Sequence, residues 1–71
     1  MEPGRPINLR QWRLYRLLTQ AELAEATGLT ERSLRDLENG TPPRISTLRK
    51  LAKALEIEAA ALYRLPEDNA K

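Results

Sequence analysis

The chain has 71 residues and a formal net charge of +2, and it contains no cysteine and no histidine. This length suits one domain that buries roughly 60% of its unfolded surface, which leaves its stability marginal. The missing residue types exclude disulfides, the common zinc and copper sites, and Ser-His or Cys-His nucleophile pairs. We therefore expect no metal, no cofactor and no enzymatic activity, and a fold stabilised by helix packing, with or without dimerisation.

The composition predicts an all-α fold. Leucine and alanine are frequent, whereas valine and phenylalanine are absent, and β-branched and aromatic residues are the strand formers. No apolar run approaches the roughly 18 residues of a membrane-spanning helix, and residues 1–10 lack the apolar stretch of a signal peptide. We expect a cytoplasmic, nucleoid-associated protein.

The charges are unevenly distributed along the chain. Residues 1–20 and 44–53 are basic, whereas residues 21–43 carry more acids than bases. We divide the chain into a flexible arm (1–6), a single domain (7–65) and a polar tail (66–71). The arm is either a frayed terminus or a segment that reaches into a DNA groove.

The first helix is predicted to begin after Asn8. Asn8 and Gln11 have the spacing of a capping box, and Leu9, Trp12 and Leu17 fit one apolar stripe. The basic residues on this helix recur every three positions and therefore lie along one edge: Arg10, Arg13 and Arg16. This edge is either solvated or faces phosphate, and Arg13 alone has the further alternative of an internal ion pair.

Two short helices with a tight turn are predicted between Thr19 and Gly40. Thr19 and Glu22 form a second capping box, and the helix over residues 20–27 ends at Gly28. Thr30 opens a helix over residues 31–38 with only two apolar positions, Leu34 and Leu37. Two helices joined by a short turn with glycine form the helix-turn-helix of many DNA-binding proteins.

Two further helices follow the extended Thr41-Pro42-Pro43 link. One starts between Arg44 and Ser46 and has an apolar stripe that includes Ile45, Leu48, Leu51 and Leu55. A last short helix covers residues 58–63, with Leu62 as its apolar residue. The sequence therefore predicts a compact bundle of five helices.

Residues 9–62 resemble the phage-repressor and Cro-like (XRE-type) helix-turn-helix family. The resemblance is carried by Arg13, Thr19-Gln20, Glu22-Leu23-Ala24, Gly28, Glu38-Asn39-Gly40, and the Thr47-Leu48 and Leu51-Ala52-Lys53-Ala54-Leu55 segments in the same order and spacing. It implies a lambda-repressor-like bundle of five helices whose second and third helices bind double-stranded DNA. A transcriptional regulator, most simply a repressor, is the function that this resemblance implies.

The resemblance also assigns roles to individual residues. It implies that the third helix faces bases in the major groove through Thr30, Glu31, Arg32, Ser33 and Asp36. Among these, Arg32 suits guanine O6 and N7. It further implies backbone contacts from Gln20, Asn39, Thr41 and Arg44. Arg35 either binds a phosphate or pairs with Glu31 four residues earlier.

Arg13 and Glu38 have a structural role in this family, as an ion pair between the first helix and the end of the third. Leu17 and Glu56 occupy positions where glycine is usual, so we expect the first helix to run beyond Leu17. Glu31 and Asp36 stand where glutamine is frequent; a carboxylate accepts from cytosine N4 but repels phosphate.

The small size of the domain indicates which binding partners to expect. One module buries roughly 600–1,000 Å² on DNA, so a homodimer on a palindromic operator is expected. Leu62, Tyr63 and Leu65 are the candidate interface residues, with the alternative that they cover the core. The acidic third helix leaves a second function open: a protein-interaction module or antitoxin-like partner with weak or no DNA binding.

Overall fold

The computed structural model describes residues 5–66. Residues 1–4 of the predicted arm and residues 67–71 of the predicted tail lie outside the described residues. The described chain begins at an exposed Arg5 and ends at a buried Pro66. The division into arm, domain and tail therefore stays a prediction at both ends.

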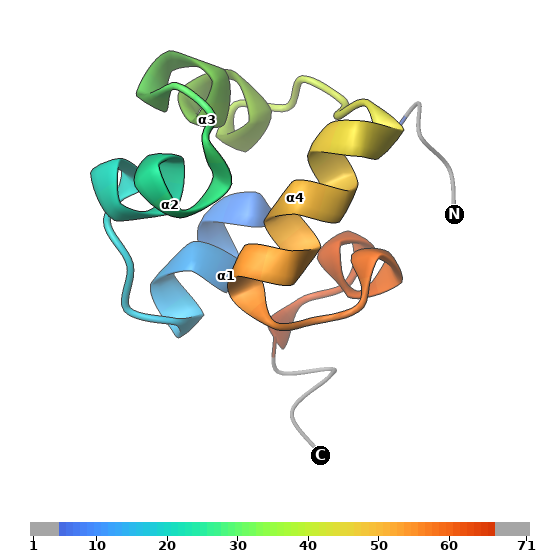
Figure 1. The fold of residues 1–71 in the computed structure, drawn as a ribbon. Coiled ribbons are helices and arrows are strands. Elements are labelled where there is room, and N and C mark those ends of the chain that lie inside the picture. The colour runs from blue at the N-terminus through green and yellow to red at the C-terminus, as the bar shows by residue number, and fades with distance from the viewer. Residues whose placement is uncertain (1–4, 67–71) are drawn as a thin grey trace.

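The described residues contain four α-helices, one 3₁₀ helix and no strand (Figure 1). The elements are α1 (Leu9–Tyr15), α2 (Gln20–Thr27), α3 (Glu31–Glu38), α4 (Ile45–Leu55) and the 3₁₀ helix η1 (Ala59–Tyr63). The prediction of five α-helices is wrong in its last member. Arg64 N–H donates to Ala61 O at 2.9 Å, and Pro66 disfavours a helical Leu65, so the short final segment stays a tight 3₁₀ turn.

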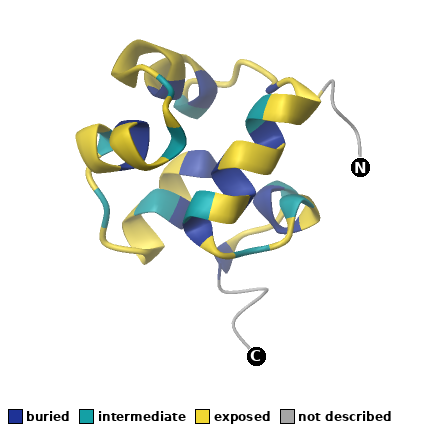
Figure 2. Ribbon diagram, in the orientation of Figure 1, coloured by how far each residue is buried: buried dark blue, intermediate teal, exposed yellow. Residues whose placement is uncertain are grey.

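The core lies between α1, α4 and η1 and extends under α2 and α3 (Figure 2). Its largest fully buried side chains are Trp12, Leu9, Leu23, Leu34, Leu48, Leu51, Leu55 and Leu62. The indole nitrogen of Trp12 donates to Ala61 O at 3.0 Å and to Arg64 O at 2.9 Å. This side chain therefore fastens η1 and the segment after it to α1.

The first helix differs from its prediction at both ends. The Asn8 side chain makes no capping hydrogen bond, so the predicted capping box is absent. The helix ends at Tyr15 and does not run through Leu17, a residue that has a φ of 59° and is 89% exposed. Leu17 N–H bonds to Leu14 O, and Leu18 N–H bonds to Arg13 O, which is the pattern of a Schellman ending.

The end of α4 repeats this geometry at Glu56. Its φ is 60°, and the N–H groups of Glu56 and Ile57 bond to the carbonyls of Lys53 and Ala52. Leu17 and Glu56 thus both adopt the left-handed conformation, in spite of its cost to a residue with a Cβ. The predicted apolar stripe of α4 is wrong at Ile45, which lies in the first turn and is about half exposed.

None of the helices in residues 5–66 combines the length and the apolar character needed to cross a membrane.

Candidate functional site

The candidate site is built on α2, the turn after it and α3. Thr19 Oγ1 accepts from Glu22 N–H at 3.0 Å, and the Glu22 carboxylate accepts from Thr19 N–H at 2.8 Å. The two bonds close the predicted capping box. Gly28 then ends α2 with a φ of 76°, which a residue with a Cβ adopts only at a cost. These local features fix where the chain turns into α3.

The start of α3 is held by Thr30. Its Oγ1 accepts from Ser33 N–H at 3.0 Å, and its hydroxyl donates to the Ser33 hydroxyl oxygen at the same distance. Leu34 and Leu37 are the buried residues of α3. The residues predicted to face bases are all exposed: Thr30, Glu31, Arg32, Ser33 and Asp36.

Arg32 lies at the centre of the exposed side of α3. Successive helical residues turn by about 100°, so Arg32 points nearly opposite to Leu34 and Leu37, with Arg35 and Asp36 on its two sides. No ion pair joins Arg32 or Arg35 to an acid within residues 5–66. The two guanidinium groups therefore remain available to a ligand, and the alternative pairing of Arg35 with Glu31 is not formed.

The single carboxylate of Glu38 connects three helices. Arg13 of α1 donates from Nε to Oε2 at 2.6 Å and from Nη2 to Oε1 at 3.2 Å. Arg13 Nη1 also donates to Leu18 O at 2.8 Å. The side chains of Arg13 and Glu38 are only 11% and 6% exposed. The two charges are therefore paired with each other inside the fold and contribute little to the charge of the protein surface.

Gln20 completes this network from the first turn of α2. Its Nε2 donates to Glu38 Oε1 at 3.2 Å. A glutamine amide has a second hydrogen on Nε2 and a carbonyl oxygen, so one bond does not exhaust its capacity. The sequence prediction of a phosphate contact did not include this internal bond, which fixes the orientation of the Gln20 amide.

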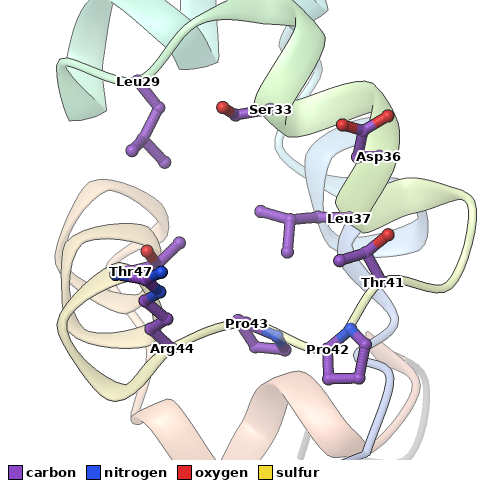
Figure 3. Close-up of a pocket in the computed structure, with 9 residues that line it drawn as sticks. All are labelled: Leu29, Ser33, Asp36, Leu37, Thr41, Pro42, Pro43, Arg44 and Thr47. Atoms are coloured by element: carbon purple, nitrogen blue, oxygen red, sulfur yellow. The ribbon is translucent and has the colours of Figure 1, made fainter.

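The link between α3 and α4 forms one wall of a hollow of about 230 Å³ (Figure 3). Thr41 N–H donates to Asp36 O at 3.0 Å, which folds the link back against α3. The hollow is lined by Leu29, Ser33, Asp36, Leu37, Thr41, Pro42, Pro43, Arg44 and Thr47. It brings two predicted base-contact residues together with two predicted backbone-contact residues. Asn39, the remaining backbone-contact candidate, is exposed at the end of α3.

Two of the three arginines on the predicted basic edge of α1 make contacts inside the fold. Arg13 is paired with Glu38, and Arg16 reaches the end of α4, where its Nε donates to Leu55 O at 2.9 Å. Arg16 Nη2 also donates to Glu56 O at 3.4 Å. Arg16 thus satisfies carbonyls that a helix end leaves unpaired. No local sequence signal reveals this role, because the two partners lie about forty residues apart.

The predicted dimer residues do not form one exposed surface. Leu62 is fully buried in the core of its own chain, so it cannot be an interface residue. Tyr63 is partly buried, and the guanidinium of Arg5 lies 5.7 Å from the centre of its ring. Leu65, at 41% exposed, is the most accessible of the three. Leu62 instead follows the alternative prediction that it covers the core.

The comparisons with known proteins agree with this arrangement. A helix-turn-helix family model matches residues 9–62, and no curated protein sequence matches the chain. The structure is similar to that of SinR, a master regulator for biofilm formation, in complex with DNA: the TM-score is 0.74 and the identity 27%, over 80% of this chain and 94% of that one. It is also similar to NHTF, a hypothetical transcription factor from Neisseria, with a TM-score of 0.74 and 28% identity, over 87% of this chain and 71% of that one.

The matched segment is more than half of the chain and contains α2, α3 and the turn between them. The chain therefore belongs to the helix-turn-helix family.

Proposed function

We propose that the chain is a DNA-binding transcriptional regulator that acts as a sequence-specific repressor by inserting α3 into the major groove. The helix-turn-helix family and the two similar structures, a regulator bound to DNA and a transcription factor, support DNA-binding regulation.

The main support for this function is the exposed side of α3, where Arg32 and Arg35 have no ion-pair partner within residues 5–66. Leu34 and Leu37 hold one side of the helix in the core, while Arg32 points outward without an ion-pair partner in the described residues. A helix presented in this way fits the major groove, where arginine binds guanine O6 and N7 through two hydrogen bonds. We assign base contacts to Thr30, Glu31, Arg32, Ser33 and Asp36.

Backbone contacts are assigned to the residues around α3. They are Gln20, Arg35, Asn39, Thr41 and Arg44, all at least partly exposed. Gln20 lies in the first turn of α2, where the free N–H groups and the helix dipole favour a phosphate. Its bond to Glu38 holds the amide in place before DNA arrives, which lowers the entropic cost of the contact.

The acids of α3 influence which sequence is bound. Asp36 and Glu31 accept hydrogen bonds from cytosine N4 but repel phosphate. Arg44 lines the same hollow as Asp36 and offsets part of this repulsion. We therefore expect a site in which guanine lies opposite Arg32 and cytosine lies near Asp36 or Glu31.

Selection from random double-stranded sequences tests the function directly. The expected result is an enriched site, and Arg32→Ala weakens its binding by roughly 1–3 kcal/mol and relaxes preference at one base pair. Arg44→Ala weakens binding evenly across sequences and lowers the salt dependence by about one phosphate contact. Lys53→Ala, an exposed change in the last turn of α4, is the charge-matched control.

Two results would contradict the proposal. If the Arg32→Ala variant binds DNA as tightly and as selectively as the parent, α3 does not have the assigned role of contacting bases. If no sequence is enriched at low salt, the protein-interaction function gains support, since the same exposed charges of α3 then serve a protein partner. A reporter gene with the selected site in its promoter distinguishes repression from activation.

A further inference from the structure

A hollow between α2 and α4 contains none of the residues assigned to DNA. It has a volume of about 410 Å³, and we name it the α2–α4 hollow; it is lined by Ala26, Thr27, Lys50, Lys53 and Ala54. The two helices pack against each other (Figure 1). The backbone of the walls is therefore already in place in the free protein.

The two lysines of the α2–α4 hollow have no partner in the fold. Lys50 and Lys53 are exposed, and neither makes an ion pair or a hydrogen bond within residues 5–66. Residues three apart on a helix are neighbours, and like charges at this spacing repel each other. No acid lies within residues 44–53 to offset this repulsion. An anionic ligand would relieve it.

The remaining walls of the α2–α4 hollow are apolar in effect. Ala26 and Ala54 contribute methyl groups. The Thr27 hydroxyl donates to Leu23 O at 2.8 Å and accepts from Leu29 N–H at 3.3 Å, so it is already engaged at the end of α2. Among the lining side chains, the two ammonium groups are thus the polar groups left for a ligand. Such a site suits an apolar group with negative charge next to it.

We propose that the α2–α4 hollow binds a segment of an acidic protein. An apolar side chain of that segment enters the hollow, and carboxylates on either side of it pair with Lys50 and Lys53. The positive surface continues to Arg49, which is also exposed and without an ion-pair partner in the described residues. A surface of this length matches the successive carboxylates of a chain segment better than one small anion. The inference goes beyond the proposed function and does not depend on DNA binding.

The apolar walls favour a protein segment over nucleic acid. Lysine pairs with phosphate as readily as with carboxylate, so charge alone does not distinguish the two. A DNA backbone, however, presents charged phosphates and has no apolar side chain that could enter the hollow. Because none of the residues assigned to DNA lines the hollow, the partner also leaves those residues free.

The exposure of the lysines limits the strength of this contact. Ion pairs at a solvent-exposed site contribute little each, and salt screens them. Burial of one apolar side chain provides the rest. We therefore expect a dissociation constant on the order of 10–100 μM that rises with salt concentration.

Fluorescence anisotropy of two labelled peptides tests the proposed chemistry. The first peptide has one leucine between acidic residues, and the second has serine in place of the leucine and the same charge. We expect the leucine peptide to bind in the stated range and the serine peptide about tenfold more weakly. Equal binding of the two peptides would show that charge alone attracts them and would overturn the proposal.

Charge reversals test where the peptide binds. Lys50→Glu and Lys53→Glu should each raise the dissociation constant of the leucine peptide by about tenfold. Arg10→Glu makes the same change in charge at an exposed residue of α1 and should stay within about twofold of the parent. Equal losses in all three variants would show an effect of net charge and contradict a site at the lysines.

A neutral substitution tests the hollow itself. Ala26→Gln places a larger polar side chain at the exposed wall of the hollow, and glutamine is a good helix former. It should weaken the leucine peptide by about tenfold, whereas Ala21→Gln, at an exposed position of α2 outside the hollow, should not. Thermal unfolding verifies that both variants are folded. Unchanged binding by the Ala26→Gln variant would place the peptide elsewhere.

DNA binding separates this inference from the proposed function. Lys50→Gln and Lys53→Gln should bind the selected DNA site within about twofold of the parent, whereas Arg44→Ala weakens it. A loss on DNA as large as that of Arg44→Ala would place the lysines at the DNA backbone and overturn the peptide proposal. A chain that binds the leucine peptide but enriches no DNA sequence would overturn the proposed function alone.

Discussion

Helices α2 and α3 are equal in length and similar in construction, yet they treat their polar groups differently. Each has eight residues, a threonine cap that accepts from the third helical N–H, and two buried residues. In α2 the Glu22 carboxylate accepts a hydrogen bond from the backbone N–H of the capping residue Thr19. In α3 the residue at the same position is Ser33, which makes no such return bond and lies on the exposed side.

The charged residues of α3 also differ in whether they have partners within the fold. Glu38 is the one acid of α3 that is committed to the fold, and it accepts from α1 and from α2. The outward arginines of α3, Arg32 and Arg35, have no ion-pair partner within residues 5–66. Helix α2 thus uses its polar groups to define its own position, whereas α3 keeps most of them for a ligand. Contacts that stabilise the fold and side chains that remain open to a ligand are thus divided between two helices of the same size.

The largest effect is expected from a variant that removes the hydrogen-bonded link between α2 and α3. Glu38→Ala leaves the Arg13 guanidinium nearly buried without its carboxylate, so the free energy of unfolding falls by about 3–5 kcal/mol. Thermal unfolding followed by circular dichroism measures this loss.

A double variant separates charge from packing at the same place. Arg13→Met with Glu38→Leu replaces both charges by apolar groups of similar size, and we expect a stability within about 1–2 kcal/mol of the parent. Gln20 then loses its partner, so DNA affinity should still fall. A double variant as unstable as Glu38→Ala would show that shape, and not an unpaired charge, dominates.

The next effect concerns the turn that orients α3 on α2. Gly28→Ala meets no atom within 4 Å, so its cost is only that of a left-handed backbone at a φ of 76°. This conformation costs a residue with a Cβ about 1–2 kcal/mol. Chemical denaturation measures the loss, and a stability equal to that of the parent would show that the turn relaxes to another conformation.

Smaller effects are expected from variants of the two N-cap residues, Thr19 of α2 and Thr30 of α3. Thr19→Ala and Thr30→Ala should each lower stability by about 1 kcal/mol, because each removes one acceptor at a helix start. The comparison predicts that only Thr30→Ala also changes base preference. Binding of both variants to the selected site and to its single-base changes checks this, and equal changes in preference would contradict the division between α2 and α3.

The smallest effect is a gain in stability away from both helices. Glu56 is exposed and has a φ of 60°, so Glu56→Gly removes the strain of a left-handed residue and should raise stability by about 0.5–1 kcal/mol. The carbonyl that accepts from Arg16 remains. Unchanged DNA affinity in this variant would show that affinity does not simply follow stability.

Local signals predicted the framework of the site well. The bounds of α2 and α3 follow from Thr19, Gly28, Thr30 and Asn39-Gly40, whose effects reach only a few residues along the chain. The two leucines of α3 likewise follow from helical spacing. These features are local, so a single sequence contains the information needed to place them.

The errors came from contacts between distant segments. Arg16 bonds to the end of α4, and Leu62 lies in a core that α1 and α4 build around it. Leu17 was expected to continue a helix, since its left-handed conformation is unfavourable locally and is sustained by the fold around it. The hollow beside α3 also depends on the Thr41-Pro42-Pro43 link, which folds back against α3. Hydrophobic periodicity does not predict the path of such a link.

Trp12 gives this protein a built-in optical probe. It is the only tryptophan in the chain, it is buried, and its indole nitrogen is bonded to the carbonyls of Ala61 and Arg64. Its emission therefore reports whether η1 and the following segment remain attached to α1. Unfolding and dissociation of the C-terminal segment can be followed through this intrinsic fluorescence, while DNA binding is followed through a label on the nucleic acid.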